Sequence, residues 1–287
     1  MFLCQFDDNR LGLVENDLIR DVTSILDRLP SQRYPYPRCD VFIEGLAALR
    51  PAILDLAYRA PAIRCSKVQL LSPVANPGKV IGAPVNYAKH LEEARIDPGL
   101  HHQNPAHLQP VHQIGLFLKA TSSVIGPSHG VVIQHPERRT DHEVELAVII
   151  GKRAKSIFRA DALSYVAGYC IGLDITVRGA EERSLRKSID TYTVLGPWMV
   201  TSDELLDPSQ LTLSLSVNGD IRQKGYTRDL ILDVAELIEF ASSFYTLYPG
   251  DVLLSGTPEG VGPINSGDVM VASIDVIGDM EVKVRAA

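Results

Sequence analysis

The feature that most constrains this chain is an apolar run from Thr140 to Lys152 that carries two glutamates, Glu143 and Glu145. In an extended strand, side chains two residues apart point to the same face, so both carboxylates lie opposite Val144. The glutamate face then continues with apolar residues, which indicates a cleft or a core rather than open solvent. Two buried carboxylates need a partner, which is a cation of the protein or, more simply, a divalent metal ion.

A third acidic residue, Asp174, interrupts a second strand-like run, GYCIGLDITVRG. The short helix predicted from Ala160 to Val166 would connect the two runs and make them neighbours in space. Three carboxylates form an all-oxygen half-shell that suits Mg²⁺ or Mn²⁺ and leaves positions for water and substrate oxygens. Zinc is disfavoured, because no pair of His or Cys near these acids has zinc spacing; His142 is expected on the opposite face of the strand.

Length and composition bound the class of protein. At 287 residues, the chain exceeds one average domain, so we expect a principal domain with a smaller appendage. The net charge of −7 argues against nucleic acid or an anionic membrane as a partner, because either would need a basic protein surface. The four cysteines are scattered, as is typical of reduced thiols in a cytoplasmic protein. The acidic N-terminal stretch is unlike a signal peptide, and no apolar run approaches transmembrane length.

Residues 1–70 are predicted to form a small N-terminal domain, and residues 71–287 a catalytic domain. Short strand patterns open the first part, and the apolar spacing between Val41 and Tyr58 predicts a helix that Pro51 breaks or starts. We find no residues suited to catalysis in this part, which is expected to pack against the larger domain.

The fold class follows from the balance of elements. Strands outnumber helices and no regular βαβ alternation appears, which predicts a mixed, β-rich α+β fold. Alternation before Asn218-Gly219 predicts a hairpin. A helix capped by Asp233 is expected to continue to about Thr246, with Phe244 on its packing stripe.

A second group of polar residues lies on a helix that Asn86 is predicted to cap. His90 and Glu93 are three residues apart, so they share one face, and the carboxylate can orient the imidazole as a base that activates water. The alternative is an ordinary surface histidine. The next segment, Asp97 to Gln113, lacks hydrophobic periodicity and predicts a mobile loop.

Four histidines occur in that loop: His101, His102, His107 and His112. Their irregular spacing favours solvated side chains over a metal-binding tract.

Five motifs follow one another along the chain: DHEVELAVIIGK, GYCIGLDITVRG, KSIDTYTVLGPW, VNGDIRQ and PGDVLLSGTPEGVG. In this order they resemble the fumarylacetoacetate hydrolase family over about Lys79 to Val284. The resemblance implies that family's mixed β-roll, usually in a homodimer. It also implies Mg²⁺ or Mn²⁺ held by Glu143, Glu145 and Asp174, in agreement with the residue-level interpretation.

The resemblance further implies roles for individual residues. Lys187 matches a position beside the metal, where its ammonium would offset the acids and donate to a substrate oxygen. As a residue alone, it is equally a surface lysine. His90 and Glu93 match a catalytic dyad on a lid at about residues 86–113.

Substrate contacts are expected at four positions. Arg178 is retained from the family pattern and could bind a carboxylate, whereas Glu181 replaces a polar amide that touches substrate in several members. Thr191 matches a position near the metal. Thr257 lies in a glycine-rich turn whose amides could bind a carboxylate, although such turns are often only structural. Lys119 either binds an anion or merely ends a strand.

These observations predict a metal-dependent hydrolase that cleaves a carbon–carbon bond in a 3-acylpyruvate or 2,4-diketo acid, such as fumarylpyruvate. The partner is thus a small-molecule keto acid. Two alternatives share the same metal site: decarboxylation of a 2-keto acid such as oxaloacetate, and a lyase or isomerase acting on 2-hydroxymuconate-type acids. A non-catalytic sugar-acid binding protein is a further alternative, but the combination of His90, Glu93 and Lys187 argues against it.

Overall fold

The computed structural model describes all of the chain except residues 102–108. It shows an α+β fold rich in strands, which confirms the predicted fold class. Within the histidine-rich segment, His102 and His107 lie outside the described residues, as does the side chain of His101. His112 is exposed, as expected.

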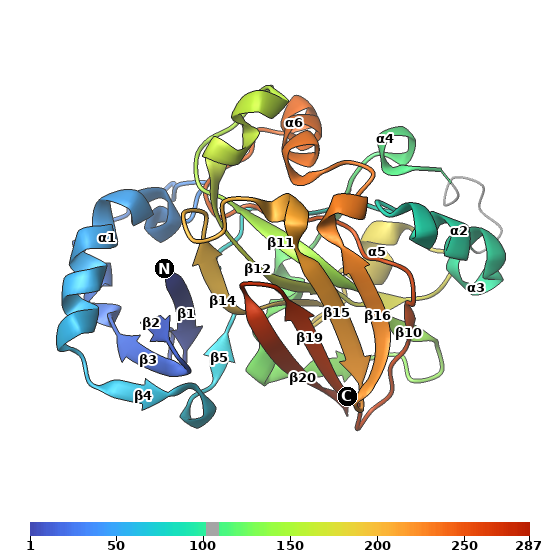
Figure 1. Cartoon of the computed structure of the whole chain (residues 1–287), viewed down its shortest axis with the longest axis horizontal. Helices are drawn as coiled ribbons and strands as arrows, with labels where there is room; N and C mark the ends of the chain where they lie inside the picture. Colours follow the sequence, from blue (N-terminus) through green and yellow to red (C-terminus); the bar gives the residue numbers. More distant parts are fainter. Residues whose placement is uncertain (102–108) are drawn as a thin grey trace.

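The largest sheet of the described chain runs from the N-terminal strands to the strands that carry the acidic residues (Figure 1). Its strands, in spatial order, are β4 (Ala62–Arg64), β3 (Leu18–Asp21), β2 (Arg10–Glu15), β1 (Phe2–Phe6), β14 (Thr193–Thr201), β12 (Val166–Asp174), β11 (Val144–Ile150), β17 (Val252–Leu254), β6 (Val80–Gly82) and β7 (Phe117–Lys119). Two short strands extend it: β5 (Leu70–Leu71) pairs with β1, and β8 (Val124–Ile125) pairs with β14.

Two smaller sheets complete the strand architecture of the described residues. One contains, in order, β16 (Asp220–Tyr226), β15 (Thr212–Val217), β19 (Val269–Ile274), β20 (Gly278–Ala286) and β9 (Val131–Ile133). The other contains β13 (Thr176–Val177), β10 (Thr140–His142) and β18 (Gly262–Pro263). In Figure 1 the strands β15, β16, β19 and β20 lie in front of β11 and β12.

The described helices are short, apart from α1 and α6. They are α1 (Val41–Arg59), α2 (Ala88–Ile96), α3 (Pro98–His101), α4 (Val111–Ile114), α5 (Arg183–Lys187) and α6 (Val234–Phe244). The segment expected to be a loop between Asp97 and Gln113 thus contains α3 and the start of α4 on either side of the residues that are not described. No helix of the described chain is long and apolar enough to cross a membrane.

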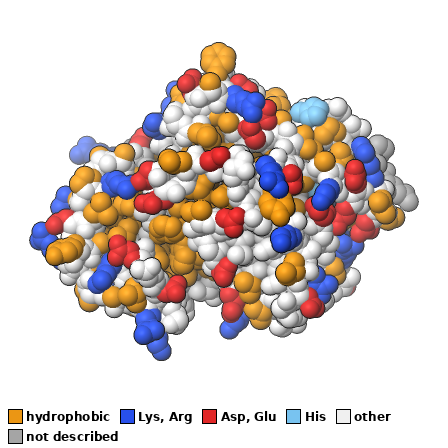
Figure 2. Space-filling model, viewed as in Figure 1, with side chains coloured by type: hydrophobic (Ala, Val, Ile, Leu, Met, Phe, Trp, Pro, Cys, Tyr) orange, Lys and Arg blue, Asp and Glu red, His pale blue; other side chains and the backbone are white. Residues whose placement is uncertain are grey.

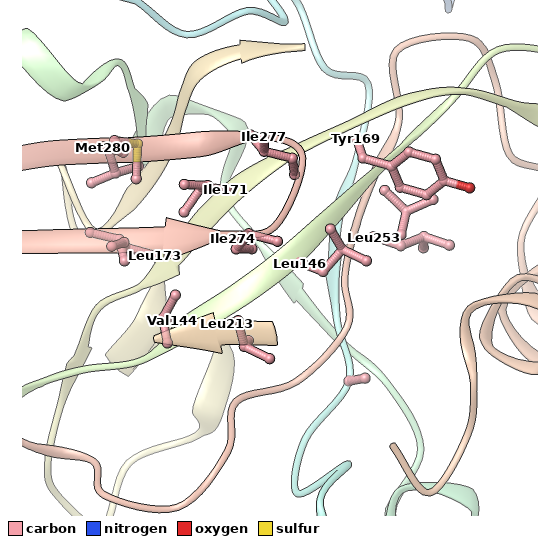
Figure 3. Close-up of a cluster of buried hydrophobic side chains, with 14 of the residues drawn as sticks. Val144, Leu146, Tyr169, Ile171, Leu173, Leu213, Leu253, Ile274, Ile277 and Met280 are labelled. Atoms are coloured by element: carbon pink, nitrogen blue, oxygen red, sulfur yellow. The ribbon is translucent and has the colours of Figure 1, made fainter. Parts of the chain in front are cut away.

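The two faces of β11 enter different cores. Val144 and Leu146 point into the core beneath the five-stranded sheet, where Figure 3 shows them near Leu213 and Ile274. Ala147, on the face of the glutamates, belongs to a second core that includes residues of α1 and β1. The glutamate face therefore becomes apolar within two residues, as the alternation predicts.

The N-terminal elements are joined to the catalytic part through the backbone. β1 pairs antiparallel with β14, with Phe2 opposite Val200, so one sheet crosses the predicted boundary at residue 70. In Figure 1 these blue elements form the left part of the molecule, with α1 outermost. The division at residue 70 remains a prediction.

The turn and helix-cap signals in the sequence correctly predict a hairpin and the start of a helix, but not the packing at the end of that helix. The Asn218-Gly219 turn joins β15 and β16, as expected, and Asp233 forms a capping box with Glu236 at the start of α6. That helix ends at Phe244, whose side chain is 63% exposed, so its predicted place on the packing stripe is wrong. The connection between β11 and β12 is a 3₁₀ helix, Arg159–Tyr165.

Two predictions about helix ends are corrected. Pro51 lies inside α1 and neither breaks nor starts it. The helix begins instead at Asp40, whose carboxylate accepts from the Phe42 and Ile43 amides, and its buried residues pack on both sides of the proline. Asn86 does not cap α2: its side chain donates to the carbonyls of Leu232 (2.9 Å) and Ser255 (2.8 Å).

Candidate active site

Strand pairing brings the three predicted metal ligands together. β11 and β12 are antiparallel neighbours with Glu145 opposite Gly172, and the amide of Asp174 donates to the carbonyl of Glu143 (2.9 Å). One carboxylate oxygen from each of Glu143, Glu145 and Asp174 lies within 4.8 Å of the other two, and all three side chains are buried. An all-oxygen cluster of this kind suits Mg²⁺ or Mn²⁺.

Two buried lysines neutralise part of this cluster. Lys187 Nζ lies 2.6 Å from both Glu143 Oε2 and Asp174 Oδ2, and 2.7 Å from Thr176 Oγ1. The other Asp174 oxygen pairs with Lys119, whose Nζ also donates to the carbonyl of Tyr192 (3.0 Å). The sequence left open whether Lys119 binds an anion or merely ends a strand. Its pairing with Asp174 makes it part of the site.

Glu145 differs from the other two acids because no cationic side chain of the described chain pairs with it. Within the described chain, the Gly256 amide donates a hydrogen bond to Glu145 Oε2 at 2.6 Å. Burial raises the pKa of Glu145 well above its ordinary value, and the charges of Asp174 and Glu143 act in the same direction. A divalent ion would supply the missing positive charge, so the residues fit such an ion.

Glu143 lies in the opposite electrostatic environment. Burial disfavours its charge, but Lys187 and Arg178 outweigh burial and hold the pKa of Glu143 well below its ordinary range. Arg178 is fixed in place because its Nη2 donates to Glu143 Oε1 (2.9 Å) and its Nε to Asp141 Oδ2 (2.7 Å). Glu143, which lies between β10 and β11, and Glu145, within β11, thus have opposite pKa shifts, the pattern expected at a functional site.

His90 and Glu93 lie together on α2. His90 is 7% exposed, lines the same pocket as the three acids, and places Nδ1 at 2.8 Å from Glu93 Oε2. The other Glu93 oxygen accepts from the amide of Gly260 at 2.9 Å. A β-carbon at Gly260 would lie 2.1 Å from the carbonyl oxygen of Arg222, and φ is +92°, so only glycine fits this turn.

The glycine-rich turn binds carboxylates, but they are the protein's own. Its amides hold Glu145 and Glu93, so the expectation that they are free for a substrate carboxylate is not supported. Thr257 in this turn does line the pocket, and its Oγ1 accepts from Gln223 Nε2 (2.8 Å). Because that oxygen already accepts, the hydroxyl proton remains for donation into the pocket.

Gln223 is a positioning residue that sequence reasoning missed, although it ends the VNGDIRQ motif. The side chain is 1% exposed, and its Oε1 lies 3.0 Å from His142 Nδ1 and accepts from the Val144 amide at 3.1 Å. Burial lowers the pKa of His142, so this ring stays neutral. The amide therefore connects β10 and β11 with the turn that carries Thr257.

The remaining predicted contacts separate into two groups. Arg178 lines the pocket, whereas Glu181 and Thr191 do not. Glu181 is exposed and pairs with Arg138 (2.8 Å), and the Thr191 hydroxyl accepts from the Val132 amide (2.9 Å). A substrate contact at either position is therefore a prediction without support from the pocket geometry.

The pocket also contains residues that sequence reasoning did not select: Phe117, Arg183 and Arg186, together with Ala94 and Leu100 of the expected lid. Arg183 and Arg186 lie four residues and one residue before Lys187 in the sequence. The adjacent helical spacing was the available signal, because residues 183, 186 and 187 fall on one side of a single helical turn.

Comparisons with known proteins agree with this geometry. The family profile "fumarylacetoacetate (FAA) hydrolase C-terminal" matches residues 79–285. Maleylpyruvate hydrolase of Aquipseudomonas alcaligenes is 55% identical over 286 residues, which cover 100% of both chains. The mitochondrial oxaloacetate tautomerase Fahd2a of Rattus norvegicus is 37% identical over 250 residues, 83% of this chain and 76% of the relative.

A solved structure is similar over the whole length. It is maleylpyruvate hydrolase from Sphingobium sp. SYK-6 in complex with manganese(II) and pyruvate, with a TM-score of 0.84, 39% sequence identity and 100% coverage of both chains. With most of its length matched by the family profile and full-length relatives at this identity, the chain belongs to the fumarylacetoacetate hydrolase family.

Proposed function

We propose that this protein is a divalent-metal-dependent hydrolase that cleaves a 3-acylpyruvate or related 2,4-diketo acid into a carboxylic acid and pyruvate. Maleylpyruvate is the first substrate to test, because a relative with that activity in its name is 55% identical over the full length. The observation that carries the proposal is the convergence of Glu143, Glu145 and Asp174 with His90 in one pocket.

The metal is Mg²⁺ or Mn²⁺. The related structure with manganese(II) and pyruvate supports this assignment, as does the unpaired charge of Glu145. A divalent ion held by the three acids supplies Lewis-acid stabilisation of negative charge that builds up on substrate oxygens.

The chain's own residues handle the water and its proton. The Nδ1 proton of His90 is directed at Glu93, so Nε2 is available to accept a proton from water. The deprotonated water then attacks the carbonyl carbon of the acyl group. Glu93 fixes the ring orientation and stabilises the positive charge that forms on it. Thr257 donates its hydroxyl proton to a substrate oxygen.

Lys187 compensates charge in this scheme. All three protons of its ammonium are directed at Glu143, Asp174 and Thr176. A hydrogen bond from Lys187 to substrate therefore requires one of these bonds to be given up. Its supported role is to offset the negative charge of Glu143 and Asp174 and to hold both side chains in place.

Decarboxylation or tautomerisation of oxaloacetate is the principal alternative, since tautomerases are among the relatives. Hydrolysis is favoured because it needs a base for water, and His90 is buried beside the acids with an orienting carboxylate. An isomerase or lyase acting on 2-hydroxymuconate-type acids is the other alternative that would use the same metal site.

The experiment is a substrate panel with the purified protein and Mg²⁺ or Mn²⁺. Pyruvate release from maleylpyruvate, fumarylpyruvate and acetopyruvate is followed with a coupled dehydrogenase, and oxaloacetate consumption is followed in parallel. Release of equal amounts of pyruvate and carboxylic acid supports hydrolysis. Turnover of oxaloacetate alone would overturn the proposal.

Two further properties are proposed. A homodimer is supported by the hydrophobic side chains that gather in the hollow between the N-terminal part and the strands β19 and β20 in Figure 2. Light scattering should give twice the chain mass of 31.4 kDa. A cytoplasmic location is supported by the four free cysteines, and fractionation of the source cells tests it.

A further inference from the structure

The pocket contains three arginines, and only one of them has carboxylate partners among the described residues. Arg178 is paired with Asp141 and Glu143. Arg183 and Arg186, both on α5, line the same pocket without a salt bridge. Cations held in a pocket normally pair with anions, so two guanidinium groups without a described carboxylate partner indicate that an anion binds there.

Arg186 is the stronger observation. Its side chain is 2% exposed, and its Nε donates to the carbonyl of Glu181 at 2.8 Å, which fixes the direction of the guanidinium. Its buried Nη1 has no hydrogen-bond partner in the described part of the chain. Leaving a buried, charged donor unpaired is costly, and the cost is recovered when a ligand accepts from it.

Other buried polar atoms show that this feature is specific to the pocket. Three more side-chain atoms of the described chain lack partners, on Tyr87, His142 and Ser255, but none of these residues lines the pocket. Of the four described residues with an unpaired buried side-chain atom, Arg186 is therefore the one that lines the pocket, where a substrate could accept the hydrogen bond.

Arg183 adds a second charge beside Arg186. Its guanidinium lies 5.9 Å from the centroid of the Phe117 ring, and no described carboxylate pairs with it. Burial lowers the pKa of Arg183 to about 10, with the charge of Arg186 acting in the same direction. A carboxylate that binds at these two residues would stabilise both positive charges.

The anion is not one of the protein's pocket acids. Glu143 and Asp174 are bound by Lys187, and Glu145 by the turn amide. A plain acylpyruvate has a single carboxylate next to its keto group, at the end that the metal ligands and Thr257 serve. A second carboxylate, at the acyl end, could pair with Arg183 and Arg186, because the pocket cations Arg178 and Lys187 are already paired with carboxylates of the protein.

We propose that Arg183 and Arg186 form an anion subsite for a carboxylate at the acyl end of the substrate, so that the enzyme selects 3-acylpyruvates with a dicarboxylic acyl group. This inference rests on the proposed function and specifies its substrate class. Planar, bidentate recognition of a carboxylate is the task for which arginine is best suited.

The test compares two substrates in two glutamine variants, one charge-preserving variant and one control variant. Arg186→Gln and Arg183→Gln should lower kcat/KM for maleylpyruvate by about 10²-fold. For acetopyruvate, which has a methyl group in place of the carboxyvinyl group and so lacks the second carboxylate, kcat/KM should stay within about threefold. Arg186→Lys should recover part of the loss, since it restores charge without the fork geometry. The control is Arg153→Gln, an exposed arginine outside the pocket, which should change neither value.

An equal loss on both substrates would overturn the subsite, because it would mean that the arginines bind the pyruvyl carboxylate or hold the fold. No loss on maleylpyruvate would also overturn it. A protein that hydrolyses neither substrate would contradict the proposed function instead. In that case calorimetry with maleate and Mn²⁺ still decides on the subsite: wild-type protein should bind maleate and Arg186→Gln should not.

Discussion

His90 and Glu93 form a hydrogen-bonded pair one helical turn apart, with Nδ1 of the imidazole 2.8 Å from Oε2 of the carboxylate. The second carboxylate oxygen accepts from Gly260 in the glycine-rich turn, so α2 and that turn are connected through one side chain. The orientation of the imidazole, and with it the direction of Nε2, is therefore set by contacts that do not involve the metal ligands.

The first prediction separates hydrolysis from reactions that need no activated water. His90→Ala should lower kcat/KM for acylpyruvate hydrolysis by about 10² to 10⁴-fold, the usual contribution of a positioned base. Glu93→Gln should act in the same direction with a smaller effect. Oxaloacetate decarboxylation, if measurable, should fall much less. Steady-state kinetics on both substrates checks this, and full hydrolase activity in His90→Ala would exclude the mechanism.

The second prediction concerns the metal. Glu145→Gln should lose the rise in melting temperature that Mg²⁺ or Mn²⁺ gives to the wild type, because an ion bound only by the folded state stabilises it by about 2.7 kcal/mol at a concentration of 100 Kd. Thermal denaturation and calorimetry measure this. The matched control is Glu281→Gln on the exposed side of β20. An unchanged metal titration in Glu145→Gln would exclude it as a ligand.

The third prediction concerns Gln223. Gln223→Leu keeps the volume but leaves the Thr257 hydroxyl and His142 without their partner, so the free energy of unfolding should fall by about 3 kcal/mol. KM should also rise, because Thr257 is no longer held. Urea denaturation and kinetics check both effects. Gln210→Leu, at an exposed position, should change stability by less than about 0.5 kcal/mol.

The fourth prediction is a pH dependence at the end of α2. Asp97 Oδ2 lies 3.0 Å from Arg139 Nη1, and Oδ1 accepts from the Gly99 amide at 2.8 Å. Burial opposes the charge, but the amide and the arginine outweigh it and hold the pKa of Asp97 below its ordinary value. The resulting stability is present above the unfolded pKa of about 3.9 and is lost as the pH falls through the folded pKa.

Asp97→Asn should accordingly lower the free energy of unfolding by about 0.5 kcal/mol near neutral pH. The difference from wild type should disappear as the pH falls below the lowered folded pKa of Asp97, where the carboxyl is neutral in both the folded and the unfolded state. Urea denaturation across the pH range measures it. Asp55→Asn removes a comparable but exposed pair with Arg59 on α1 and serves as the control. A difference that persists in acid would mean that Asp97 acts through packing.

Much of the site could be predicted because its residues follow local periodicities. Glu143 and Glu145 were placed on one face by the two-residue repeat of a strand, and His90 and Glu93 by the three-residue spacing of a helix. The fold class followed from the same patterns. These signals are encoded within a few residues, so they do not depend on knowing which strands are neighbours.

The rest depends on contacts between distant segments. Lys119 reaches Asp174 only because β6 places β7 at the end of the main sheet, and no local pattern gives that pairing. Pro51 and Asn86 were misassigned for a related reason, since packing keeps α1 intact and Asn86 is used by two distant carbonyls. Arg186 has the sequence environment of a surface residue, and only its burial distinguishes it.

The placement of the pocket residues has a consequence for how such enzymes diverge. Glu145 and Asp174 lie on strands that are hydrogen-bonded on both sides, so a substitution or insertion there disturbs the largest sheet. Arg183 and Arg186 lie on α5, a helix of five residues. After a gene duplication, changes at Arg183 and Arg186 that spare Lys187 would give descendants new acyl-group preferences while the bond-breaking step is inherited unchanged.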